Sequence, residues 1–190
     1  MRFFDWLFGR TRLTRPKSEP LFQLITVQVD LETVLGWVSA GAAALCLKPV
    51  QTVEFMEMKE ELQSLLQLVL EESGTDLRIE HDDYGYLWLI FKDEDFEDLV
   101  GVTHIATQEL QEKGYGEQML AAVFRFSGPG ISAPHYLIYS YKRGGFYPFI
   151  PLPGKKRDHP RELRAASLLP KYLPVEADQS RWYPLWDCPL

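Results

Sequence analysis

The chain has 190 residues, of which 46% are hydrophobic and 25% are charged, and its net charge at pH 7 is −7. A length and composition of this kind predict one folded globular domain and exclude a wholly disordered chain. The acidic balance argues against a nucleic-acid partner, and no apolar run reaches the roughly 18 residues that a membrane-spanning helix needs.

The first 17 residues form an arm that differs from the rest of the chain in charge. Residues 1–17 carry five basic residues and one acidic residue, a net charge of +4, which leaves −11 for residues 18–190. The apolar run is too short for a secretory signal peptide, and the basic residues follow it. Such a segment can contact an anionic membrane surface or a partner, or it can pack on the domain. The candidate contacts are Phe3, Phe4, Trp6, Leu7, Phe8, Arg10 and Arg12.

Residues 18–175 predict a single α+β domain. Apolar residues at helical spacing predict two main helices, over 53–72 and 95–113, and a glycine follows each of them, as at many helix ends. Weaker signals predict short helices over 30–38, with Asp30 as N-cap, and over 160–169.

Apolar runs bounded by turn residues mark the strands of the same domain. We expect a mixed or antiparallel sheet of about five strands, with the two main helices packed on one face. Pro148 places the last strand at an edge of the sheet, because proline cannot donate to a ladder. The candidate strand segments are 41–48, 76–81, 86–93, 119–127, 135–142 and 146–151.

Patterns that indicate catalysis are missing from the sequence. It has no glycine-rich phosphate loop and no Gly-x-Ser-x-Gly motif, and its four histidines lack the spacing of a zinc site. Cys46 and Cys188 form no metal or redox motif, which indicates a reducing cytoplasm. The nearest acid–base cluster is His81-Asp82-Asp83, whose aspartates turn formation also explains. We therefore expect no catalytic residue, no metal and no cofactor.

Two segments combine aromatic with basic residues. The stretch 139–149 and the basic residues 155–157 can bind a phosphate-bearing group or an acidic partner. Alternatively, the rings face the core and the hairpin tip is only solvated. The aromatic tail over 176–190 is either a docking peptide or a segment held across the domain. The candidate contacts are Lys142, Arg143, Tyr147, Arg157, Arg181, Trp182 and Trp186.

Four blocks of the sequence, in order, resemble the motifs of one bacterial family. They are Leu7–Thr11 (LFGRT), Asp82–Leu89 (DDYGYLWL), Tyr141–Gly154 (YKRGGFYPFIPLPG) and Ser180–Trp186 (SRWYPLW), and Arg157-Asp158 follows the third block. On these blocks the chain resembles the PspAB family of PspA-associated proteins over nearly its whole length. Its last four residues depart from the family pattern.

The resemblance implies an association with phage shock protein A, a coiled-coil protein that supports the inner membrane under envelope stress. It implies no catalytic residues. We therefore expect a non-enzymatic adaptor, cytoplasmic or peripheral at the inner membrane, that binds a PspA-type coiled coil or an anionic membrane surface.

Two further options stay open. The element order is similar to that of secretion-chaperone-like domains, which often dimerise, so a homodimer is one of them, on fold analogy alone. The other is an enzyme or small-ligand-binding protein with a site near Asp82–Tyr86 and Lys142–Arg143. That site requires the two segments to converge on one pocket.

Overall fold

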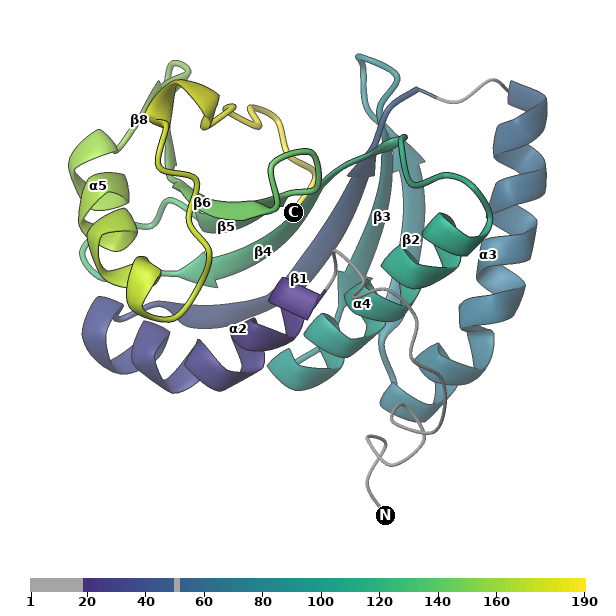
Figure 1. Ribbon diagram of the computed structural model, residues 1–190, viewed down its shortest axis with the longest axis horizontal. Coiled ribbons are helices and arrows are strands. Elements are labelled where there is room, and N and C mark those ends of the chain that lie inside the picture. Colours follow the sequence, from purple (N-terminus) through teal and green to yellow (C-terminus); the bar gives the residue numbers. More distant parts are fainter. Residues whose placement is uncertain (1–18, 50–51) are drawn as a thin grey trace.

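The computed structural model describes residues 19–49 and 52–190 (Figure 1). The predicted arm over residues 1–17, with its seven candidate contacts, lies outside these residues. Among the described residues no helix combines the length and apolarity that crossing a bilayer requires.

The described chain folds into a single α+β domain built on one antiparallel sheet. Its six strands lie in the order β2-β3-β1-β4-β5-β6, so the expected antiparallel sheet is confirmed, with six strands. The strands are β1 (Val38–Leu47), β2 (Asp76–His81), β3 (Leu87–Lys92), β4 (Met119–Ser127), β5 (His135–Ser140) and β6 (Gly145–Phe149); a separate small hairpin pairs β7 (Pro151–Leu152) with β8 (Lys156–Arg157).

Both predicted main helices are confirmed, as α3 (Thr52–Ser73) and α4 (Phe96–Glu112). Asp95 caps α4, because its carboxylate accepts hydrogen bonds from the backbone N–H groups of Glu97 and Asp98. The short helix predicted over 160–169 is α5 (His159–Leu168).

The helix predicted over 30–38 is wrong in its limits. The chain forms α2 (Glu19–Asp30), and a π-helical turn (Leu31–Leu35) continues it, so Asp30 ends a helix and makes no side-chain cap. The helix lies further upstream because its buried residues, Leu21, Leu24, Val27 and Leu31, already recur at helical spacing there. Gly36 then closes the turn in a left-handed conformation, with φ of 68°.

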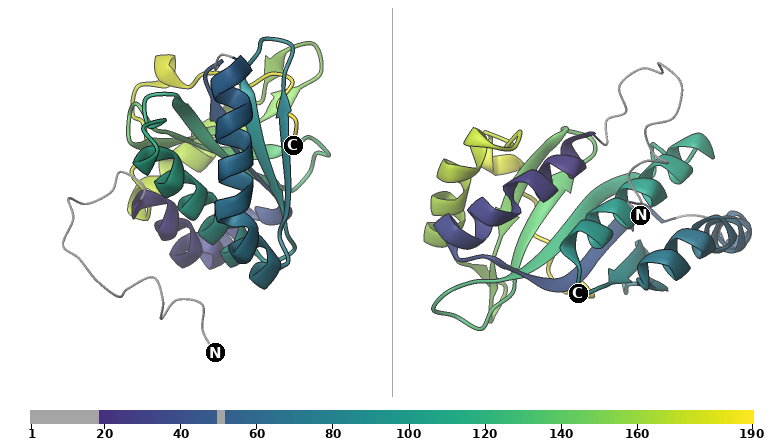
Figure 2. Two further views of the ribbon diagram at one scale, coloured as in Figure 1. Left: turned by 90° about the vertical axis from the view of Figure 1, so that its right-hand side faces the viewer. Right: turned by 90° about the horizontal axis from the view of Figure 1, so that it is seen from below.

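The sheet has two differently covered faces. Helices α2, α3 and α4 pack on one face over a large apolar core, and Figure 2 shows the three helices on that side. The opposite face carries a second cluster, which includes Cys46, Trp88, Tyr147 and Phe149. Its cover is the C-terminal segment, since Trp182 is buried there and Leu185 and Trp186 pack beside it.

The two edges of the sheet also differ. β6 is an edge strand, as Pro148 predicts. The backbone of residues 174–176 covers its outer side, because Phe146 N–H donates to Pro174 O and Glu176 N–H donates to Phe146 O. At the other edge, β2 has β3 as its neighbour among the described strands.

Candidate functional site

A cavity of about 480 Å³ lies on the sheet face that the C-terminal segment crosses. Three distant parts of the chain form its walls: the β2–β3 turn (82–86), the β5–β6 turn with Lys142 and Arg143, and residues 183–186. We call this site the aromatic groove. Its remaining lining residues are Cys46, Trp88, Leu120, Ala121, Ser140 and Tyr147.

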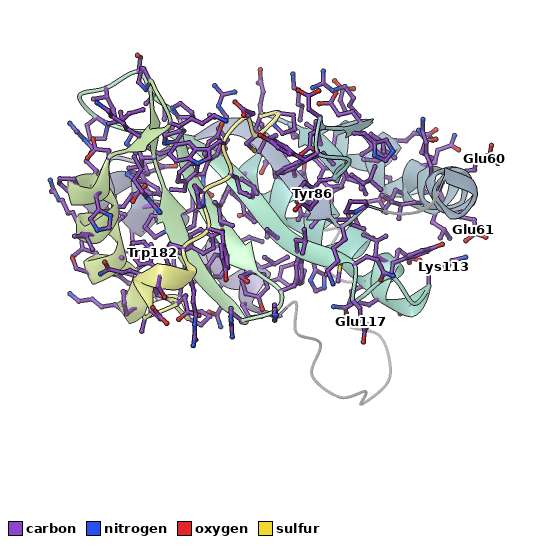
Figure 3. The ribbon with its side chains drawn as sticks, turned by 90° about the horizontal axis from the view of Figure 1, so that it is seen from above. Glu60, Glu61, Tyr86, Lys113, Glu117 and Trp182 are labelled. Atoms are coloured by element: carbon purple, nitrogen blue, oxygen red, sulfur yellow. The ribbon has the colours of Figure 1, made fainter. Side chains whose placement is uncertain are left out.

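Figure 3 shows the C-terminal segment, in yellow, passing over the strands of this face. Tyr86 lies on the side toward α3 and Trp182 on the side toward α5. The two segments named in the sequence, 82–86 and 142–143, therefore meet at one site, although about sixty residues separate them along the chain.

Asp82 organises the β2–β3 wall. Its Oδ1 accepts hydrogen bonds from the backbone N–H groups of Tyr84 and Tyr86, both at 2.9 Å, and its Oδ2 accepts one from Nε1 of Trp88, also at 2.9 Å. Three donors therefore share this carboxylate. This accords with the explanation of Asp82 by turn formation rather than by acid–base chemistry.

Lys142 and Arg143 form a basic rim at the tip of the β5–β6 turn. Both are exposed, and backbone hydrogen bonds from Arg143 and Gly144 to the carbonyl oxygen of Ser140 shape the turn. Within the described part of the chain, neither side chain forms a salt bridge. Two hydrogen bonds from Ser180 lower the pKa of Asp178, and Arg143 adds a weaker electrostatic contribution. The rim thus presents two positive charges to the groove mouth.

The structure places Arg157 away from this rim. Its Nε donates to Oε2 of Glu162 at 2.7 Å, and its Nη1 donates to the carbonyl oxygen of Trp182 at 3.0 Å. Glu162 is fully buried, and its Oε1 accepts a hydrogen bond from the backbone N–H of Ile150. Arg157 therefore connects the fold to the C-terminal segment. It does not line the groove.

Of the aromatic candidate residues, Trp182 is buried in the fold, whereas Tyr147 and Trp186 line the groove. Trp182 is 4% exposed and stacks on Tyr147, with ring centroids 6.5 Å apart. The hydroxyl of Tyr147 donates to the carbonyl oxygen of Tyr183 at 3.0 Å, and both residues line the groove. Trp186 is half-buried and lines it too, with its ring edge-on to Phe149. Arg181 pairs with Asp178 and Glu176 outside the lining.

Two titratable groups inside the groove, the Cys46 thiol and the Tyr147 hydroxyl, are neutral at physiological pH. Burial raises the pKa of the Cys46 thiol, and the neighbouring Cys188 and Asp82 raise it further. Burial also raises the pKa of the Tyr147 hydroxyl. Across residues 19–49 and 52–190, no three His, Cys, Asp or Glu side chains gather as a metal site. The charged residues of the lining are therefore Asp82 in the β2–β3 turn and Lys142 and Arg143 at the mouth.

Sequence reasoning did not identify Cys46, Leu120 and Ser140 as groove residues. They lie on three different strands within ordinary strand patterns, and nothing local distinguishes them. Trp88 lies within the block 82–89 that carried the family resemblance, which was the available signal for it.

Comparison with known proteins gives one match. The model of the PspAB family, described as PspA associated protein B, matches residues 1–190. No curated protein and no solved structure matches the chain.

Proposed function

The chain belongs to the PspAB family, PspA associated protein B, and from this membership together with the aromatic groove we propose a non-enzymatic adaptor that binds a PspA-type partner. The observation that carries the proposal is the convergence of the 82–86 turn, the basic rim and the C-terminal segment on one cavity of about 480 Å³.

The chemistry of the groove favours a particular kind of partner segment. The floor and walls are rich in aromatic and aliphatic side chains, among them Trp88, Tyr147 and Trp186. Large aromatic residues at the centre of a contact surface commonly supply most of the binding energy. Lys142 and Arg143 at the mouth complement carboxylates. We therefore infer a partner segment that places apolar side chains in the groove and acidic side chains at its rim.

The state of Cys46 supports a binding role over a catalytic one. A thiol acts as a nucleophile in its thiolate form, and burial raises the pKa of Cys46. Asp82, the candidate for acid–base chemistry, accepts hydrogen bonds from three donors of its own hairpin. The proposed adaptor would act in the cytoplasm, or at the inner membrane if residues 1–17 bind anionic lipid.

A pull-down with a purified PspA-type protein tests the proposal, with and without anionic vesicles. The variant K142E/R143E reverses the rim, and R164E/K171E is its control, because it changes the net charge equally at exposed positions outside the groove. We expect the rim variant to bind roughly tenfold more weakly or worse, since reversing two interface charges costs at least about 1.4 kcal/mol. Binding that both variants retain contradicts the groove as the contact surface. Capture by vesicles alone replaces the adaptor with a peripheral membrane protein.

A second pair of variants separates binding from folding. Trp186→Ala removes an aromatic lining side chain that is half-buried, whereas Trp182→Ala removes a buried anchor. We expect Trp186→Ala to weaken partner binding at a smaller cost in stability than Trp182→Ala. A Trp186→Ala variant that binds like the wild type argues against an apolar contact in the groove.

The cavity also favours a second candidate function, the binding of a small anionic ligand. A volume of about 480 Å³ lies within the range of roughly 300–1,000 Å³ for small-molecule sites. An apolar cavity with cations at its mouth suits an aromatic or aliphatic carboxylate or phosphate. Thermal shift measurements with a panel of such compounds distinguish the two functions. Stabilisation that K142E/R143E abolishes would favour the small ligand if the partner protein also fails to bind.

A further inference from the structure

The outer edge of β2 has no strand paired with it among the described residues. At the opposite edge, the backbone of Pro174 and Glu176 covers β6 through two hydrogen bonds to Phe146. Among the described strands, β2 pairs with β3 and with no second strand. An edge strand presents unpaired N–H and C=O groups and is a template for pairing with another chain.

A cleft opens beside the first residues of this edge strand. It has a volume of about 610 Å³ and lies between α3 and the start of β2, where Gln63, Gln67 and Glu71 face Asp76 and Leu77. Figure 1 shows α3 standing at the outer side of β2, at the margin of the molecule. Leu77 and Ile79 pack against the helix-side core but are only partly buried. An added strand at this edge would complete their burial.

We propose that β2 pairs with β2 of a second copy of this chain, antiparallel about a two-fold axis at Ile79. In such a symmetric pair, facing residues lie on the same side of the sheet, so the axis passes through one residue and its equivalent. With the axis at Arg78, Arg78 would face Arg78 of the second copy. With the axis at Glu80, Glu80 would face Glu80 of the second copy. Like charges directly opposite destabilise a strand pair.

The register centred on Ile79 avoids both conflicts. It sets Arg78 opposite Glu80 of the second copy and, by symmetry, Glu80 opposite Arg78 of the second copy. Ile79 then meets its own equivalent on the helix side. Arg78 and Glu80 are already neighbours along one strand, at 3.2 Å, and are partly exposed. An axis at Leu77 also sets opposite charges together, Asp76 facing Arg78 of the second copy. In that register only residues 76–78 of the two strands pair, whereas residues 77–81 pair when the axis lies at Ile79.

The charge pattern of β2 is therefore self-complementary, which points to a second copy as the occupant of this edge. The surface is separate from the lining of the aromatic groove, apart from the turn at residue 82 that follows β2. The proposed pairing does not depend on the proposed adaptor function, because the two use different surfaces.

Sedimentation velocity of the full chain over a range of concentrations tests the pairing. We expect the wild type to dimerise, R78E and E80R each to shift the chain to monomer, and the double swap R78E/E80R to restore the dimer. Lys113→Glu is the matched control, because it breaks an exposed ion pair with Glu61 outside β2 and should leave the dimer intact. A monomeric wild type, a dimer that neither single reversal weakens, or a double swap that stays monomeric overturns the proposal.

Cross-linking tests the register itself. Ile79→Cys should form an intermolecular disulfide under mild oxidation, since residue 79 faces its own copy. Leu77→Cys should cross-link far less, since it faces His81 of the second copy. The wild type corrects for its own thiols, Cys46 and Cys188, which are both free. Equal cross-linking at both positions, or none at residue 79, contradicts the axis at Ile79.

Discussion

A hydrogen bond of 2.9 Å joins Oδ2 of Asp82 to the indole Nε1 of Trp88. The two residues lie six positions apart, one in the β2–β3 turn and one in β3, and both line the aromatic groove. The other oxygen of Asp82 holds the backbone of the turn. Asp82 is thus a positioning residue that fixes one wall of the groove to its floor.

Replacing Asp82 by alanine should destabilise the protein and weaken partner binding. The substitution leaves the buried indole N–H of Trp88 without an acceptor, and a lost buried hydrogen bond costs about 1–3 kcal/mol. Urea denaturation measures the free energy of unfolding. Asp83→Ala is the control, since Asp83 is exposed in the same turn, and it should change stability by less than about 0.5 kcal/mol. Equal effects of the two substitutions contradict this role for Asp82.

Arg157→Ala should be among the most destabilising single substitutions in the domain. It leaves the fully buried carboxylate of Glu162 without its guanidinium partner and frees the carbonyl oxygen of Trp182. Breaking a buried ion pair costs about 3–5 kcal/mol. We also expect faster protease cleavage within residues 176–190, because the C-terminal segment loses one of its attachments.

Arg181→Ala is the control for Arg157→Ala. Its pairs with Asp178 and Glu176 are partly exposed, and a surface pair contributes about 0–1 kcal/mol. If the two arginine variants unfold at the same urea concentration and are cleaved equally fast, Arg157 does not hold the segment.

Alkaline pH should destabilise the fold. Burial raises the pKa of Tyr136 and of Cys188 to about 12, and it also raises the pKa of Cys46, Tyr141 and Tyr147. The unfolded chain releases these protons near the ordinary values of 9.0 for cysteine and 10.0 for tyrosine, while the folded chain retains them. Unfolding therefore becomes more favourable as the pH rises above about 9.

Tyr141→Phe isolates one contribution to this alkaline loss. The hydroxyl of Tyr141 lies 2.6 Å from Oγ1 of Thr107, so its removal should cost about 1 kcal/mol at neutral pH. The variant should then lose less stability than the wild type between about pH 9 and pH 11. Urea titrations at several pH values measure how the free energy of unfolding of each protein depends on pH. The same dependence in the variant and the wild type would exclude Tyr141 from the effect.

Deleting residues 1–12 should abolish binding to anionic vesicles and leave the fold intact. The deletion removes the seven candidate membrane contacts and, with Arg2, three of the five basic residues of the arm. Each basic residue near an anionic surface contributes about 1 kcal/mol. Vesicle sedimentation measures the binding, and circular dichroism checks the fold. A truncated chain that still sediments with vesicles contradicts a membrane role for the arm.

Local sequence determined most of the secondary structure. The spacing of apolar residues predicted α3 and α4, and the strand segment 119–127 has the limits of β4. These elements depend on backbone hydrogen bonds and on burial of one face, both of which repeat along the chain. The error at Asp30 has the same origin. Aspartate is common at N-caps, so Asp30 predicted the start of a helix. The apolar spacing upstream of it instead matches the observed helix, Glu19–Asp30.

Tertiary structure alone decided which of the candidate residues share a site. Lys155, Lys156 and Arg157 form one basic cluster in the sequence, yet Arg157 pairs with buried Glu162. Lys142 lies far along the chain from Asp82, yet the strand order brings their turns to one cavity. Strand order and the path of the C-terminal segment depend on contacts between distant residues. No local period encodes such contacts, so the groove became visible only in the folded chain.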